Sequence, residues 1–125
     1  MQKPENAKER NLIKGAIRRI FSRSELRQSI INRYTVDHFD PNRPRVTKWV
    51  YCAECGLIFP RYLAEVDHNQ PIIPLQAKLE DLTWDDVIDA IWCDEYNLRV
   101  MDKECHKIKT KEENKIRRDF KKART

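Results

Sequence analysis

Apolar residues recur every three or four positions between residues 12 and 21, which predicts a helix with one apolar face. Arg18 and Arg19 fall on its other side, so this helix is expected to be basic as well as amphipathic. Ser24 is a typical N-cap residue and predicts a second helix. That helix is expected to end before residues 37–44, because two prolines in this run cannot continue it.

Short strands and two further helices are expected in the rest of the chain. Residues 48–52 and 63–68 have the pattern of strands, and Gly56 suits a tight turn between them. Thr83 opens a sequence that resembles a capping box and predicts a helix. Asp102 can cap a final helix, which is expected to extend into the basic C-terminal end.

The distribution of charge changes this picture more than the net charge of +5 does. Residues 1–50 carry 12 Lys or Arg against 5 Asp or Glu, residues 51–102 carry 3 against 11, and residues 103–125 carry 10 against 4. Basic ends around an acidic middle suit a protein that grips phosphates and holds a cation at its centre. The alternative is a basic surface that only aids solubility.

The sequence also limits the cellular setting. No stretch approaches membrane-spanning length, and the first ten residues lack the apolar run of a signal peptide. We therefore expect an intracellular, cytoplasmic protein without a membrane partner. In a reducing compartment, the four cysteines are expected to be metal ligands or core residues rather than disulfides.

Three of the cysteines suit a structural zinc site. Cys52 and Cys55 have the Cys-x-x-Cys spacing of half a tetrahedral site, and Cys105 is the best third ligand. Cys93 and Asp102 both remain open as the fourth ligand. Asp102 equally suits a helix cap, and Cys93 a buried thiol. A redox dithiol is the alternative for the pair, but no thioredoxin-like pattern surrounds it.

A second set of residues suits catalysis. Asp67 offers a hard anionic metal ligand, and His68 can accept a proton near neutral pH. Neighbours in a strand point to opposite faces, so both can serve one site only where the strand ends or kinks. Asn97 and His106 follow, and His106 adjoins Cys105 on the predicted final helix. One helix could therefore face two metals.

Several basic residues are candidates for nucleic-acid binding. Lys109 lies three residues after His106 on a similar helix face, where an ammonium could meet a phosphate. An ordinary solvated lysine is the alternative. The predicted nucleic-acid-binding residues are Arg18, Arg19, Lys109, Lys121 and Lys122.

Four stretches of the chain together resemble the HNH endonucleases, especially those of bacteriophages. The stretches are Cys52-Ala-Glu-Cys55, Val66-Asp67-His68, Asn97-Leu98-Arg99-Val100-Met101 and Cys105-His106-Lys107-x-Lys109-Thr110. The resemblance spans about residues 50–114, and the order and spacing of the stretches make it specific.

This resemblance implies a ββα-metal core around one divalent cation, Mg or Mn. His68 would be the general base, Asp67 and His106 the metal ligands, and Asn97 the residue that fixes the loop and orients His68. The substrate would be double-stranded DNA, cut to leave 5′-phosphate and 3′-hydroxyl ends. Asp102 stands where relatives with a zinc site usually carry the first cysteine of a second Cys-x-x-Cys pair.

The expected fold class is α+β, a small ββα-metal core with a basic helical segment before it and a C-terminal helix. We expect a mostly helical N-terminal extension at residues 1–47, the nuclease core with its zinc knuckle at 48–114, and a basic tail at 115–125. The expected function is a metal-dependent endonuclease.

Two other functions remain open. A non-catalytic zinc-bearing DNA-binding module would explain the basic ends and the cysteines, but it leaves Asp67, His68 and Asn97 without a role. A protein-interaction domain, such as a phage assembly factor that meets packaging proteins, would use the acidic helix near residues 84–94.

Overall fold

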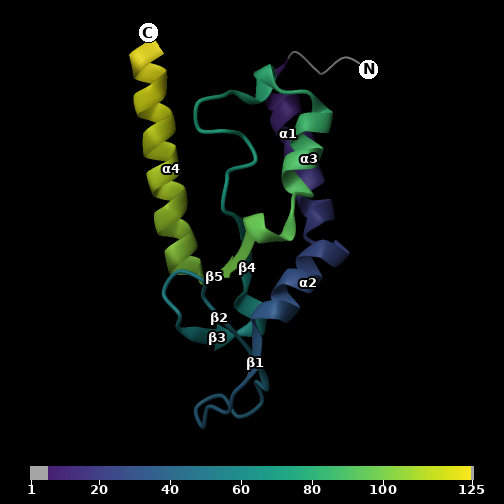
Figure 1. Ribbon diagram of the computed structural model, residues 1–125, viewed down its shortest axis with the longest axis vertical. Coiled ribbons are helices and arrows are strands. Elements are labelled where there is room, and N and C mark those ends of the chain that lie inside the picture. Colours follow the sequence, from purple (N-terminus) through teal and green to yellow (C-terminus); the bar gives the residue numbers. More distant parts are fainter. Residues whose placement is uncertain (1–5, 125) are drawn as a thin grey trace.

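The computed structural model describes residues 6–124 as an α+β fold, with four α-helices and two small antiparallel sheets among them (Figure 1). The helices are α1 (Ala7–Phe21), α2 (Glu25–Tyr34), α3 (Trp84–Ile91) and α4 (Lys103–Arg124). The strands are β1 (Thr35–Asp37), β2 (Lys48–Tyr51), β3 (Ile58–Pro60), β4 (Glu65–His68) and β5 (Leu98–Met101). The predicted α+β class is confirmed.

Capping side chains set the helix starts. The Ser24 side chain accepts a hydrogen bond from the N–H of Arg27 at 3.2 Å. In a reciprocal capping box, the N–H of Thr83 donates to Asp86 Oδ2 at 2.9 Å, and the N–H of Asp86 donates to Thr83 Oγ1 at 3.0 Å. Each bond satisfies an N–H that the helix itself leaves unpaired. The predicted starts of α2 and α3 are therefore confirmed.

The first sheet has the strand order β1-β2-β3, with β2 in the centre. Strand β2 matches the predicted strand at residues 48–52, whereas β1 and β3 were not predicted. Both missed strands have three residues, too few for a sequence pattern to develop. Gly56 has φ +76° and lies in the turn between β2 and β3, as predicted for a tight turn.

The second sheet pairs β4 with β5, and the register places Asp67 opposite Arg99 and His68 opposite Leu98. Strand β4 ends at His68, as a shared site for Asp67 and His68 requires. Helix α4 begins directly after β5 and Asp102, so β4, β5 and α4 form a β-β-α arrangement. Met101, at the end of β5, pairs with Glu65, the first residue of β4, so α4 starts beside the two strands (Figure 1).

One apolar core joins the N-terminal helices to the sheets. Phe21, Ile30 and Ile31 of α1 and α2 pack in the same cluster as Val50 and Val100 of the strands. Helix α4 continues without interruption across residues 114 and 115, where the predicted core was expected to end and the basic tail to begin. Within residues 6–124, no helix has the length and apolar content needed to cross a membrane.

Candidate functional site

Asp67 is a buried carboxylate surrounded by cationic groups. Its side chain, 7% exposed, lies 3.0 Å from Lys109 Nζ and 3.5 Å from Arg99 Nε through Oδ2. Within the described part of the chain, Oδ2 accepts no hydrogen bond of regular geometry and meets these cations only as ion pairs. Buried carboxylates are stable only when paired, so Asp67 needs positive charge beside it.

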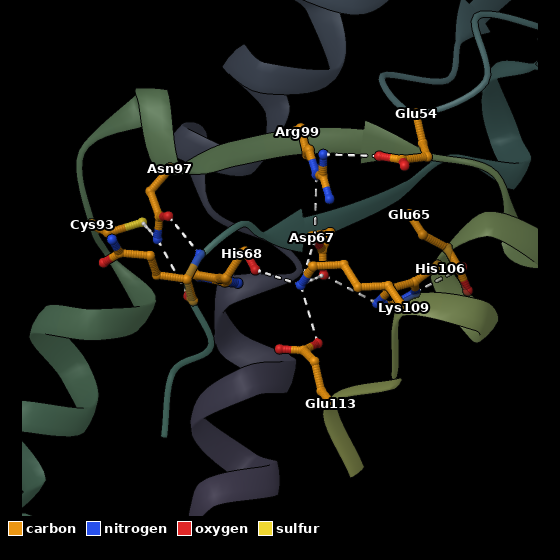
Figure 2. A network of polar contacts seen from close by, with 11 residues as sticks. Glu54, Glu65, Asp67, His68, Cys93, Asn97, Arg99, His106, Lys109 and Glu113 are labelled. Atoms are coloured by element: carbon orange, nitrogen blue, oxygen red, sulfur yellow. Dashed lines mark hydrogen bonds and ion pairs between the residues drawn. The ribbon is translucent and has the colours of Figure 1, made fainter. Parts of the chain in front are cut away.

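One backbone oxygen and two carboxylate oxygens accept hydrogen bonds from the ammonium of Lys109. Its Nζ donates to the carbonyl oxygen of His68 at 3.1 Å, to Asp67 Oδ1 at 3.3 Å and to Glu113 Oε1 at 3.1 Å (Figure 2). The side chain is only 16% exposed. Lys109 is therefore not an ordinary solvated lysine, and the position of its ammonium is one where a positive charge is stabilised.

His106 connects Asp67 to a second carboxylate. Its Nε2 lies 3.5 Å from Asp67 Oδ1, and its Nδ1 lies 3.0 Å from Glu65 Oε2. A carboxylate on Nδ1–H fixes the ring orientation and leaves Nε2 to face Asp67. Asp67 and His106 thus bring one carboxylate oxygen and one imidazole nitrogen within 3.5 Å of each other, two donors that could share one metal ion.

His68 lies on the other side of Asp67, against α1 and α3. Its Nε2 is 2.8 Å from the carbonyl oxygen of Ile91, and its ring packs 5.4 Å from the ring of Phe21. Burial lowers the pKa of His68 below its ordinary value, and the nearby charges of Arg18 and Lys109 act in the same direction. The carbonyl contact and Asp67 oppose this shift without cancelling it. At neutral pH the ring is therefore uncharged.

Asn97 fastens the loop that follows His68. Its Oδ1 accepts from the N–H of Gln70 at 2.8 Å, and its backbone carbonyl accepts from the N–H of Asn69 at 2.7 Å. Its Nδ2 lies 3.5 Å from both the Gln70 carbonyl and Cys93 Sγ. Figure 2 shows Asn97 beside this loop and away from Lys109. The geometry suits the loop-fixing role expected of Asn97.

Asp67, His68 and His106 border one cleft of about 850 Å³. Strand β4 contributes Asp67 and His68, and α4 contributes His106 and Glu113. Residues from α1, α2, α3 and the loop at 69–78 also line it. A molecule bound in this cleft therefore reaches the carboxylate, both histidines and basic side chains of α1, α2 and α4.

A separate cluster contains three thiols and one carboxylate. The ligand atoms of Cys52, Cys55, Asp102 and Cys105 all lie within 4.8 Å of one another. Cys52 and Cys55 belong to the turn after β2, and Asp102 and Cys105 to the start of α4. Four such donors at this spacing suit a tetrahedral metal ion, so the chain carries a cluster that could bind a metal.

Asp102 both caps α4 and faces the thiols. Its Oδ1 accepts from the N–H of Cys105 at 2.7 Å, and its Oδ2 accepts from the Cys55 thiol at 3.1 Å. The sequence left two roles open for Asp102, a helix cap and a metal ligand. Oδ1 caps the helix, and Oδ2 faces the thiols. Cys93 lies elsewhere, packed against the apolar core and next to Asn97, so the cluster contains Asp102 instead.

Desolvation raises the pKa of the Cys105 thiol to about 12, with further contributions from its hydrogen bonds to Cys55, Cys52 and Asp102. Crowded thiols resist losing several protons while no cation is there to balance the charge. A metal that binds here must therefore displace protons, so its affinity should fall at low pH.

The predicted nucleic-acid-binding residues are dispersed. Arg18 lines the cleft, and Lys109 is held by the protein's own oxygens within the site. Arg19, Lys121 and Lys122 are exposed on α1 and α4 and do not line the cleft. Only the first two of the five are therefore near Asp67 and His68.

Sequence reasoning missed several members of the site. Glu65 contacts His106, Arg99 contacts Asp67, and Glu113 contacts Lys109. Arg99 could have been found from the pairing of β4 with β5, since it is opposite Asp67. Glu113 is four residues after Lys109, the spacing of a helical ion pair. No sequence pattern indicated Glu65.

Comparisons with protein-family models, with curated proteins and with solved structures found no match to this chain.

Proposed function

We propose that this protein is a metal-dependent endonuclease of the HNH type, which hydrolyses phosphodiester bonds in double-stranded DNA. The observation that supports the proposal best is the convergence of Asp67, His68 and His106 on one cleft, from two separate elements. These residue types supply the two requirements of phosphodiester hydrolysis, a base for water and a place for a cation.

His68 would act as the general base. A carbonyl oxygen can only accept, so the contact with Ile91 requires the proton on Nε2 of the neutral ring. Nδ1 then carries the lone pair that takes a proton from water. Because burial lowers the pKa of His68, the ring stays uncharged and competent at neutral pH.

Asp67 and His106 would hold the divalent cation, Mg or Mn. When bound, such a cation neutralises charge on the phosphate and on the leaving oxygen. Lys109 would give up its contact with Asp67 and remain paired with Glu113, 3.1 Å away, close enough to turn toward a substrate phosphate. Arg99 would keep Asp67 in place from the neighbouring strand.

The cysteine cluster would hold a structural zinc ion. Cys52 and Cys55 would then be linked to Asp102 and Cys105, and the turn after β2 would be fixed to the first residues of α4. His106 directly follows Cys105, so the zinc would position one ligand of the catalytic cation. Small domains gain much of their stability from such sites.

The proposal is tested by incubating purified protein with supercoiled plasmid in Mg²⁺, in Mn²⁺ and in excess EDTA. We expect nicked or linear DNA with either metal and none in EDTA. Ligation of the products without prior treatment would show 5′-phosphate and 3′-hydroxyl ends. Intact plasmid in both metals, under conditions where the protein binds the DNA, would favour the non-catalytic zinc-bearing binding module.

A further inference from the structure

Four cations that line the cleft have no acidic partner among the described residues. One of them, Arg27 of α2, instead donates to the backbone carbonyl oxygens of Ser22 and Ala64. The other three, Lys14 and Arg18 of α1 and Arg117 of α4, line the same cleft as Asp67 and His68. Among residues 6–124, the ion pairs of the structure include none of these three. The rest of the site is different, since Lys109, Arg99 and His106 all face carboxylates.

The three cations are also close enough to repel one another. Desolvation lowers the pKa of Lys14, and the charges of Arg18 and Arg117 lower it further. The pKa of Arg18 is lowered by the same two causes, burial and the charge of Arg117. Lys14 and Arg18 are one helical turn apart on α1, so they project on the same face. An uncompensated cluster costs stability unless an anion binds to it.

Arg117 is held in place by the protein backbone. One of its terminal nitrogens donates to the carbonyl oxygen of Ile73 at 2.9 Å, and the other donates to Asn114 Oδ1 at 3.4 Å. These neutral partners orient the guanidinium without cancelling its charge. Arg117 is therefore an oriented cation in the cleft lining, and a guanidinium is well suited to phosphate oxygens.

The cluster is next to the reaction centre. Arg18 and His68 both line the cleft, and so does Phe21, whose ring packs on that of His68. On α4, Arg117 follows His106 and Glu113 along the cleft. An anion at the three cations would thus lie beside an anion at Asp67 and His106.

We propose that Lys14, Arg18 and Arg117 form a binding subsite for a second phosphate of the substrate strand, adjacent to the phosphate that is cleaved. The proposal rests on the proposed nuclease function for the identity of the first phosphate. A polynucleotide strand supplies phosphates at regular intervals, so one strand can occupy both places. The subsite would align the strand and leave the chemistry to Asp67, His68 and His106.

Binding without metal tests the subsite separately from catalysis. The affinity of the full-length protein for a duplex oligonucleotide would be measured in EDTA at several salt concentrations. The cleft variant is Arg18→Gln with Arg117→Gln, and the control is Lys8→Gln with Arg118→Gln, two exposed cations on the same helices that do not line the cleft. We expect the cleft pair to lose at least about tenfold more affinity than the control pair, on the scale of one lost charge-assisted bond. Equal losses in the two pairs would overturn the proposal.

A substrate with one phosphate gives a second, independent comparison. At a pH well above the pKa of His68, where loss of the Arg18 charge does not alter the protonation of this ring, the cleft pair should cleave bis(4-nitrophenyl) phosphate at a rate similar to the wild type. Cleavage of the duplex should then show a raised KM with a similar kcat. Arg117→Lys, which keeps the charge, should recover part of the duplex KM. Equal loss on both substrates would contradict a subsite. If the wild type cleaves neither substrate, the nuclease proposal fails, and the metal-free binding comparison alone decides the subsite.

Discussion

The Nε2 atom of His106 lies 3.5 Å from Oδ1 of Asp67, so the start of α4 and the end of β4 meet at one buried carboxylate. Arg99 and Lys109 form ion pairs with the same carboxylate. This relationship underlies the proposed catalytic cation, because a carboxylate and an imidazole at this separation can bind one ion together.

Loss of either ligand should weaken binding of the divalent cation. We expect Asp67→Asn and His106→Ala to raise the Mn²⁺ concentration for half-maximal cleavage, and high Mn²⁺ to restore part of the rate. The measurement is a metal titration of plasmid cleavage, with Asp37→Asn as the control because Asp37 is exposed on β1. An unchanged titration in Asp67→Asn would show that Asp67 is not a ligand.

Lys109 should compete with a cation for Asp67, since its ammonium already lies 3.0 Å from Oδ2. Lys109→Met should therefore tighten Mn²⁺ binding by protein without DNA, on the order of tenfold for the removal of one close positive charge. Calorimetric titration measures this directly, and Lys107→Met is the control on an exposed position of the same helix. Weaker Mn²⁺ binding in Lys109→Met would contradict the competition.

The cysteine cluster should retain about one zinc per chain after purification without added metal. Asp102→Asn keeps an oxygen that can cap α4 but removes the charge that faces Cys55, so zinc content should fall while the metal-free fold is preserved. Cys93→Ser should leave zinc content unchanged, because Cys93 is not in the cluster. Elemental analysis and thermal melting check both variants.

Zinc that remains at full content in Asp102→Asn would mean that the cap is the only role of this residue. Wild-type protein that is free of zinc and still melts cooperatively would show that the fold does not depend on a structural zinc ion. Cys52 would then be a core residue, since it is 1% exposed.

Asn97→Ala should impair positioning of the loop after His68 rather than metal binding. The change removes the acceptor for the N–H of Gln70, a loss worth about 1 kcal/mol of unfolding free energy. We expect slower cleavage with an unchanged Mn²⁺ requirement, and Asn11→Ala, exposed on α1, as a silent control. A changed metal requirement would place Asn97 at the cation.

Local chemistry made the helices predictable. Ser24, Thr83 and Asp102 each cap a helix through their own side chains, so the information lies within three residues of each helix start. The strands depend on partners far away in the sequence. Strands β1 and β3 exist because β2 pairs with both, and three residues alone carry too little pattern to reveal this.

The site was predictable where residue type defines chemistry. Asp67, His68 and His106 line one cleft, and their roles in catalysis stay predictions. The choice between Cys93 and Asp102 required the fold, because the turn after β2 and the start of α4 meet only through the sheets. The contact of Lys109 with Asp67 could not be predicted from the sequence either, because it depends on how α4 lies against β4.

The role of His68 is measured by the single-turnover rate of duplex cleavage at saturating Mn²⁺ in His68→Gln and His68→Ala, compared with His38→Ala. His38 is exposed and packs on Trp49 outside the cleft, so its loss controls for removing a histidine. If His68 is the general base, both His68 variants should be slower by roughly 10² to 10⁴, with DNA affinity kept and no rescue by metal. If the folded His68 variants cleave at the rate of His38→Ala, His68 is not the general base.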